Sequence, residues 1–218
     1  LSCSPVFDDS GTFSGIVVAF DDLSKINKVK STFKKYVSKN IVDKLLENED
    51  SLNLGGTESD VTILFSDIRG FTSMSEKLSP SEIVKLLNKY FKSMIDVVFK
   101  YNGTLDKIVG DELMVLYGVP LKNENDTFDA VKTAVEMFKA LDKFNKKIIS
   151  EGYEPFRIGI GINQGKAVSG NIGSDQQMNY TVIGDTINLG ARLCSHAKSG
   201  EILISKSVKD IIDNEFSF

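Results

Sequence analysis

The chain is poor in cysteine and histidine, and it has no long apolar run. Two cysteines and one histidine occur among its 218 residues, so neither a disulfide framework nor a histidine-rich zinc site is supported. Its most apolar stretch, residues 15–20, is far shorter than the roughly 20 residues that a membrane-spanning helix needs. These absences favour a chain from a reducing cytoplasm, without a membrane segment in this sequence.

Charge of one sign is not concentrated in any part of the chain. Lysine and arginine number 26 against 30 aspartates and glutamates, which gives a formal net charge of −4. Because non-specific nucleic-acid binding needs a concentrated positive surface, we expect no nucleic acid among the partners. Hydrophobic residues make up 41% of the chain, which is ordinary for a globular protein.

Two segments precede the main domain. Residues 1–24 contain a strand, an Asp-Ser-Gly turn and a second strand, and they resemble the closing hairpin of a PAS-type sensor domain whose other strands lie upstream. Residues 25–59 are predicted to be a signal-transducing linker, with helices over 21–37 and 38–48 and a polar loop over 49–59. The apolar stripe of the first helix either pairs with a second copy or lies on its own domain. Its members are Leu23, Ile26, Val29, Phe33 and Val37.

The remaining residues, 60–218, alternate strands with helices and are predicted to form one α+β domain. Strands are expected over 61–65, 103–109, 112–117, 157–162, 166–172 and 201–204, and helices over 80–101, 126–149, 185–197 and 207–212. The order is βαββαβ with additions, which favours a ferredoxin-like sandwich with its helices on one side of an antiparallel sheet. The glycine-rich stretch 159–166 lacks the spacing of a phosphate-binding loop, and we expect it to be a strand followed by a hairpin turn.

Two aspartates stand at predicted strand ends. Asp67 follows the strand 61–65 where it leaves the core, and Asp111 lies in the tight turn between strands 103–109 and 112–117. Neighbouring antiparallel strands can bring both carboxylates to one edge of the sheet, where they would suit paired magnesium ions. Taken alone, each aspartate is more readily explained as a turn residue.

The predicted helix 185–197 carries a second pair of polar residues. Asn188 and Arg192 are four positions apart, so they share one face of the helix and present an amide beside a planar guanidinium. The alternative explanation is an ordinary solvated helix surface.

Three motifs together resemble the catalytic domain of class III nucleotidyl cyclases. They are residues 65–72 (FSDIRGFT), 106–114 (DKIVGDELM) and 180–193 (YTVIGDTINLGARL), and the resemblance spans residues 61–212. It implies an adenylate cyclase of the bacterial subtype, which converts ATP to 3′,5′-cyclic AMP and pyrophosphate in signal transduction and works as a homodimer. Residues 33–46 resemble the segment through which bacterial members connect an upstream sensor to the cyclase.

The resemblance assigns roles to the two pairs of polar residues. Asp67 and Asp111, with the backbone carbonyl of Ile68, would bind two Mg²⁺ or Mn²⁺ ions that activate the ribose 3′-hydroxyl and hold the triphosphate. Asn188 would orient the ribose. Arg192 would stabilise negative charge at the α-phosphate.

It also implies which residues bind the substrate. Lys107 and Thr181 would select adenine, a combination typical of bacterial adenylyl cyclases, and Phe71 and Thr72 would contact the nucleotide. The alternative for Lys107 is a charge that keeps an edge strand soluble.

Two departures from the family pattern bear on the function. Family members place a phosphate-contacting lysine in a hairpin after the last helix, and we expect that hairpin to be missing from this sequence, which ends at Phe218. Glu112 and Leu113 after Asp111 are similar to the diguanylate cyclase signature, although Val109 replaces its first glycine. The sequence is also compatible with a guanylate cyclase, or with a catalytically silent module for dimerisation or nucleotide sensing.

Overall fold

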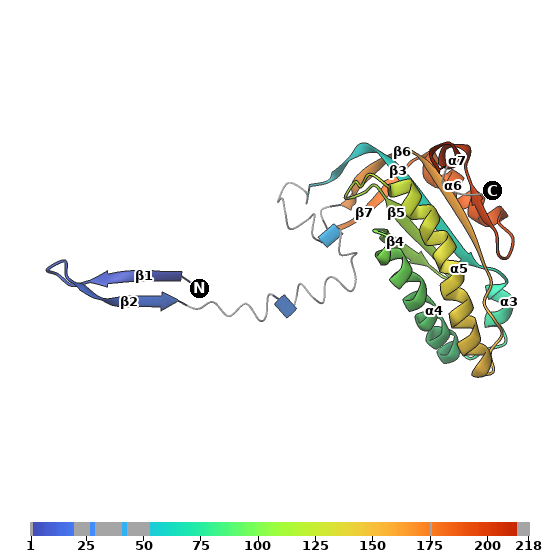
Figure 1. The fold of residues 1–218 in the computed structure, drawn as a ribbon, viewed down its shortest axis with the longest axis horizontal. Helices are drawn as coiled ribbons and strands as arrows, with labels where there is room; N and C mark the ends of the chain where they lie inside the picture. Colours follow the sequence, from blue (N-terminus) through green and yellow to red (C-terminus); the bar gives the residue numbers. More distant parts are fainter. Residues whose placement is uncertain (1, 20–26, 29–40, 43–52, 175, 213–218) are drawn as a thin grey trace. The chain divides into compact units, whose positions relative to one another are not determined.

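A computed structural model describes residues 2–19, 27–28, 41–42, 53–174 and 176–212 of the chain (Figure 1). The chain divides into two compact units, Leu1–Val37 and Ser38–Phe218. In the described ranges, no helix is both long and apolar enough to cross a membrane.

The first unit contains the predicted hairpin. Strands β1 (Ser2–Phe7) and β2 (Phe13–Ala19) pair in antiparallel fashion. The side chain of Asp8 holds the turn, because its Oδ1 accepts hydrogen bonds from the backbone nitrogens of Ser10 at 2.9 Å and Thr12 at 2.8 Å. That this hairpin closes a PAS-type domain stays a prediction. The predicted linker helices lie outside the described residues, except for 27–28 and 41–42, which are helical.

The second unit is built on a mixed sheet of six strands. These are β3 (Gly55–Ile68), β4 (Thr104–Val109), β5 (Glu112–Tyr117), β6 (Ile158–Ser174), β7 (Gln177–Ile183) and β8 (Ile202–Ile204). The main path runs β4-β5-β3-β6-β7 with every pair antiparallel, and β8 lies parallel to β6. The predicted α+β class and its antiparallel sheet are confirmed.

Five helices accompany this sheet among the described residues from 53 to 212. They are α3 (Phe71–Ser75), α4 (Pro80–Lys100), α5 (Asp126–Ser150), α6 (Asp185–His196) and α7 (Lys206–Ile212). The start of α4 is fixed by a reciprocal cap, in which Ser79 Oγ accepts from the backbone of Glu82 at 3.4 Å and Glu82 Oε2 accepts from the backbone of Ser79 at 3.0 Å. The predicted start of this helix at residue 80 is therefore confirmed.

The helices cover both faces of the sheet, so the expectation that they lie on one side is wrong. Along β3, Leu64 and Ile68 belong to the core beneath α4 and α5, whereas Ile63 and Phe65 belong to a second core that includes Cys194 of α6. Figure 1 shows α4 and α5 running together on their face. Successive residues of a strand point to opposite faces, and a strand buried on both faces is a continuous apolar run.

The predicted hairpin within residues 157–172 is also wrong, because β6 is one strand from Ile158 to Ser174. Its glycines serve close packing instead of a turn. A Cβ on Gly161 would overlap the backbone nitrogen of Cys194, and one on Gly165 would lie 2.8 Å from Thr186 Oγ1. The chain reverses later, and β7 was not predicted. The polar loop expected over 49–59 is wrong from Gly55 onward, where β3 already pairs with β6.

Candidate active site

Two aspartates meet where β3 ends and β5 begins. The pairing of these strands places Ser66 opposite Leu113, so that the following and preceding residues come together. Asp111 Oδ2 accepts a hydrogen bond from the backbone nitrogen of Ile68 at 3.2 Å. Burial, a hydrogen bond to Asp67 and the negative charge of that residue together raise the pKa of Asp111 to about 6. The expectation that both carboxylates reach one edge of the sheet is confirmed.

The carboxylate pair supplies few side-chain ligands for a metal ion. Among the described residues, no cluster of three or more histidine, cysteine, aspartate and glutamate side chains could hold a metal ion. Any ion here would take two side-chain carboxylates and complete its shell from backbone, water or substrate oxygens, which magnesium accepts readily.

Next to the carboxylate pair lies Arg69, an arginine to which the sequence motifs assign no role. Arg69 Nη1 donates to Asp67 Oδ2 at 2.7 Å, and its Nη2 donates to the backbone carbonyl of Cys194 in α6. The guanidinium thus connects the end of β3 to α6, which lies on the face of the sheet opposite to α4 and α5. In the sequence, only the position of Arg69 two residues after Asp67 suggested a role at the site. That position does not predict a contact with Cys194, which is 125 positions away.

Lys107 and Thr181 lie together, as the adenine-selecting pair was expected to. Lys107 Nζ donates to Thr181 Oγ1 at 3.1 Å and lies 2.7 Å from Asp106 Oδ2. Thr181 Oγ1 in turn donates to the same Asp106 oxygen at 3.2 Å. Asp106 could not be predicted as their partner, because neighbouring strand residues ordinarily face opposite sides of a sheet.

The two polar residues of α6 line one cavity. Its volume is about 550 Å³, and its walls carry Asn188 and Arg192 together with Asp185, Thr186, Ser205 and Lys206. The predicted common face of Asn188 and Arg192 is confirmed. In the described part of the chain, no hydrogen bond or ion pair connects either residue to Asp67 or Asp111.

The two residues expected to contact the nucleotide lie at the start of α3. The ring of Phe71 packs against the core beneath α4 and α5. Thr72 is exposed, and its backbone carbonyl accepts from Ser75 Oγ at 2.8 Å. Their predicted role toward a nucleotide stays a prediction.

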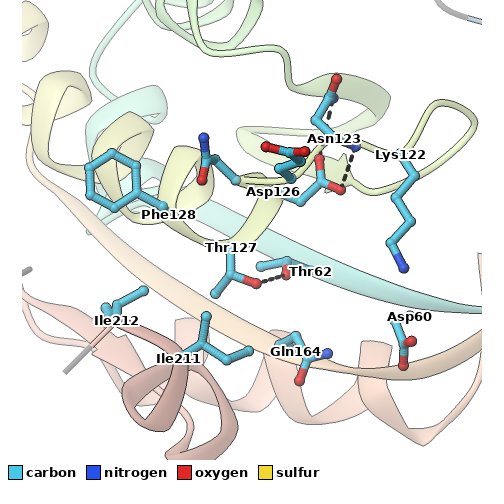
Figure 2. Close-up of a pocket in the computed structure, with 12 residues that line it drawn as sticks. Asp60, Thr62, Lys122, Asn123, Asp126, Thr127, Phe128, Gln164, Ile211 and Ile212 are labelled. Carbon is cyan, nitrogen blue, oxygen red and sulfur yellow. Dashed lines mark hydrogen bonds between the residues drawn. The ribbon is translucent and has the colours of Figure 1, made fainter. Parts of the chain in front are cut away.

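A second cavity, of about 470 Å³, lies at the start of α5 and contains none of the predicted site residues. Figure 2 shows its lining, including Lys122, Asp126 and Phe128, and the hydrogen bond of 2.8 Å between Thr62 Oγ1 and Thr127 Oγ1. We therefore place the candidate site at the carboxylate pair, the Lys107–Thr181 pair and the α6 cavity.

Comparison with known proteins points to one enzyme family. A sequence profile of the adenylate and guanylate cyclase catalytic domain matches residues 56–218. The chain is 33% identical over 162 residues to adenylate cyclase 1 of Rhizobium meliloti, covering 74% of this chain and 24% of that protein. It is also 33% identical over 193 residues to the adenylate cyclase of Anabaena cylindrica, covering 85% of this chain and 38% of that protein. The chain thus spans less than half the length of these relatives.

Solved structures of both kinds of cyclase resemble this fold. The guanylyl cyclase Cya2 is 44% identical, with a TM-score of 0.70 over 72% of this chain and 80% of that one. The adenylyl cyclase CyaB from P. aeruginosa is 38% identical, with a TM-score of 0.73 over 75% of this chain and 85% of that one. Similarity to both does not by itself distinguish adenine from guanine as the base.

Proposed function

Because the chain belongs to the adenylate and guanylate cyclase catalytic domain family, we propose that it converts ATP to 3′,5′-cyclic AMP and pyrophosphate. The observation that carries this choice of nucleotide is the contact between Lys107 and Thr181. Adenine presents an amino donor at C6 beside the acceptor N1, whereas guanine presents the acceptor O6 beside the donor N1–H. An ammonium that donates and a hydroxyl oxygen that accepts match the adenine edge, and a mismatched base would leave polar groups unpaired.

The carboxylate pair is suited to divalent cations. Asp67 and Asp111 supply hard oxygen donors. The pKa of Asp111 is raised first by burial and then by the neighbouring Asp67, and a cation would relieve the repulsion between the two carboxylates. We propose that these two side chains and the Ile68 carbonyl hold two Mg²⁺ or Mn²⁺ ions. Bound there, the ions would act as Lewis acids toward phosphate oxygens and the ribose hydroxyl.

The residues of α6 would act on the reacting groups. In the proposed reaction the ribose 3′-oxygen loses its proton to solvent water and forms a bond to the α-phosphorus, while the bond from that phosphorus to pyrophosphate breaks and pyrophosphate leaves. Asn188 would orient the ribose, and Arg192 would stabilise the negative charge that develops on the α-phosphate. Both residues line the same cavity, which suits them to neighbouring parts of one substrate.

The complete site is proposed to form between two copies of the chain. Within one protomer, no hydrogen bond or ion pair of the described residues joins Asn188 or Arg192 to the carboxylate pair. A symmetric homodimer would supply the carboxylates from one copy and Lys107, Asn188 and Arg192 from the other, which makes two equivalent sites. The hairpin β1–β2 would end an upstream sensor that controls this assembly.

One observation favours a guanylate cyclase instead: the 44% identity to the guanylyl cyclase Cya2. The purified chain should therefore be incubated with Mg²⁺ or Mn²⁺ and either ATP or GTP, and the products identified by mass. We expect cyclic AMP and a higher kcat/KM for ATP. Predominant cyclic GMP would establish the guanylate cyclase, a cyclic dinucleotide would indicate a diguanylate cyclase, and no product would indicate a silent module. Arg192→Ala is the matched inactive control.

A further inference from the structure

Strand β4 contains a bulge at Asp106. Leu105 pairs with Val115 and Lys107 pairs with Met114, so Asp106 is an extra residue opposite the regular ladder of β5. Without the bulge, residues 106 and 107 would face opposite sides of the sheet. With it, the carboxylate of Asp106 and the ammonium of Lys107 both reach the hydroxyl of Thr181.

The side chain of Asp106 is more deeply buried than that of Lys107. Its side chain is 0% exposed, whereas the side chain of Lys107 is 45% exposed. Asp106 Oδ2 accepts from both Lys107 and Thr181, and within the described residues Oδ1 has no hydrogen-bond partner. Burying a carboxylate costs free energy unless the carboxylate is paired. The hydrogen bonds to Asp106 therefore hold the side chains of Lys107 and Thr181 in place. An exposed ion pair that only aids solubility would not show this burial.

The direction of the hydrogen bonds follows from the number of protons that each group can donate. A carboxylate paired with an ammonium accepts hydrogen bonds and does not donate them, so the single hydroxyl proton of Thr181 is directed to Asp106. Toward any third partner the oxygen of Thr181 can then only accept. Lys107 donates one N–H to Asp106 and one to Thr181, which leaves one N–H for another acceptor.

We propose that Asp106 is a positioning residue that sets purine selectivity, by fixing the Thr181 hydroxyl as an acceptor and the Lys107 ammonium as a donor. This inference rests on the proposed function, in which Lys107 and Thr181 read the base. The amino group of adenine finds an acceptor in Thr181, and N1 finds the free N–H of Lys107. The O6 of guanine would instead face an oxygen without a proton to offer, and its N1–H would face a donor.

The test is Asp106→Asn, which keeps the side-chain volume and removes the charge. The amide nitrogen can donate to Thr181, so the hydroxyl proton is no longer held in one direction. We expect the ATP-to-GTP ratio of kcat/KM to fall by at least about tenfold. The preference for ATP over purine riboside triphosphate, which lacks the 6-amino group, should fall in parallel. In a Thr181→Val background, Asp106→Asn should change the ATP preference over this analogue much less, because no hydroxyl remains to be oriented.

Controls separate this role from general damage. Asp129→Asn removes a carboxylate of α5 that accepts from Asn102 Nδ2 at 3.0 Å, and it should leave both ratios unchanged. Asp106→Ser removes the charge with a smaller side chain and serves the same test if Asp106→Asn does not fold. A folded Asp106 variant with unchanged ratios, beside a wild type that prefers ATP, would overturn this inference alone. A wild type that forms no cyclic nucleotide, or prefers GTP, would overturn the proposed function and this inference with it.

Discussion

The ammonium of Lys107 donates to the hydroxyl of Thr181 at 3.1 Å, although the two residues belong to β4 and β7, the opposite ends of the main strand order. Side chains from the two ends of this strand order therefore reach one another. Seventy-four positions separate the residues in the chain, so no local preference explains the contact. A lysine that only protects an edge strand would need no such partner, which favours the base-reading role proposed for this pair.

Exchanging the polarity of this pair should change the preferred base. We expect Lys107→Glu to lower kcat/KM for ATP, and the double variant with Thr181→Cys to raise kcat/KM for GTP, because glutamate accepts where lysine donates. Steady-state rates with both nucleotides measure the ratio. Lys77→Glu is the matched charge reversal, since Lys77 pairs with Glu154 on the exposed surface. An unchanged ratio in the double variant would contradict the assignment of this pocket.

The carboxylate pair should be essential for turnover and dispensable for folding. Asp67→Asn and Asp111→Asn each keep the side-chain volume but remove a charge, and we expect each to lower kcat by at least about a hundredfold. Circular dichroism should stay native in both variants. Asp129→Asn is the matched control at a carboxylate outside the site. Near-normal turnover in either site variant would rule out its proposed role toward a metal.

The sequence was most informative where one element carries its own signal. The helix predicted over 80–101 begins at Pro80 as expected, and the apolar run of β3 marks a buried strand. What it did not indicate was the use of glycine in β6, because a turn and a close helix contact both need a residue without a side chain. Gly161 resolves the ambiguity only once α6 is seen lying on it.

The same distinction applies to the candidate site. Asp67, Asp111, Lys107 and Thr181 stand in recognisable motifs, so their groupings could be anticipated. Asp106 and Arg69 could not, since their contacts depend on a strand bulge and on a helix from a distant part of the chain. Residues that position others leave a weaker trace in a single sequence than the residues they hold.

Gly161 should be intolerant of even one methyl group. A Cβ at this position would overlap the backbone nitrogen of Cys194 and lie 2.6 Å from the carbonyl oxygen of Gly190, so β6 and α6 would have to separate. We expect Gly161→Ala to lower the free energy of unfolding by about 1–3 kcal/mol or more. Urea denaturation of the second unit measures it. Gly15→Ala in β2 has no atom within 4 Å of the new Cβ and should leave that transition unchanged. Equal stability of Gly161→Ala and wild type would contradict the packing argument.

The two thiols should differ sharply in reactivity. Burial raises the pKa of Cys194 to about 12, and its Sγ donates to the carbonyl of Gly159 at 3.4 Å, whereas Cys3 is exposed. The thiolate is the reactive form, so between pH 7 and pH 9 a raised pKa keeps Cys194 protonated. Iodoacetamide should label Cys3 alone in the native chain and both residues in urea, as read by peptide mass. Native labelling of Cys194 at a rate comparable to Cys3 would contradict its burial.

Asp67 and Arg192 should act together only across two copies of the chain. Asp67 lies at the end of β3, and Arg192 lines the α6 cavity without a hydrogen bond or ion pair to the carboxylates in the described part of its own protomer. If each site takes Asp67 from one copy and Arg192 from the other, two inactive variants can complement each other. Mixing Asp67→Ala with Arg192→Ala creates mixed dimers in which one site carries both lesions and the other carries neither.

Random pairing of equal amounts makes half of the dimers mixed, and each has one intact site out of two. We therefore expect roughly a quarter of wild-type activity, measured as cyclic AMP after subunit exchange has been confirmed with two differently tagged chains. Asp67→Ala mixed with Asp111→Ala is the matched control, because both lesions then fall on the same half of the site and no intact site can form. No recovery in the test mixture despite exchange would show that Asp67 and Arg192 serve one site within a single chain. Recovery in the control would show that Asp67 and Asp111 do not belong to the same half of the site.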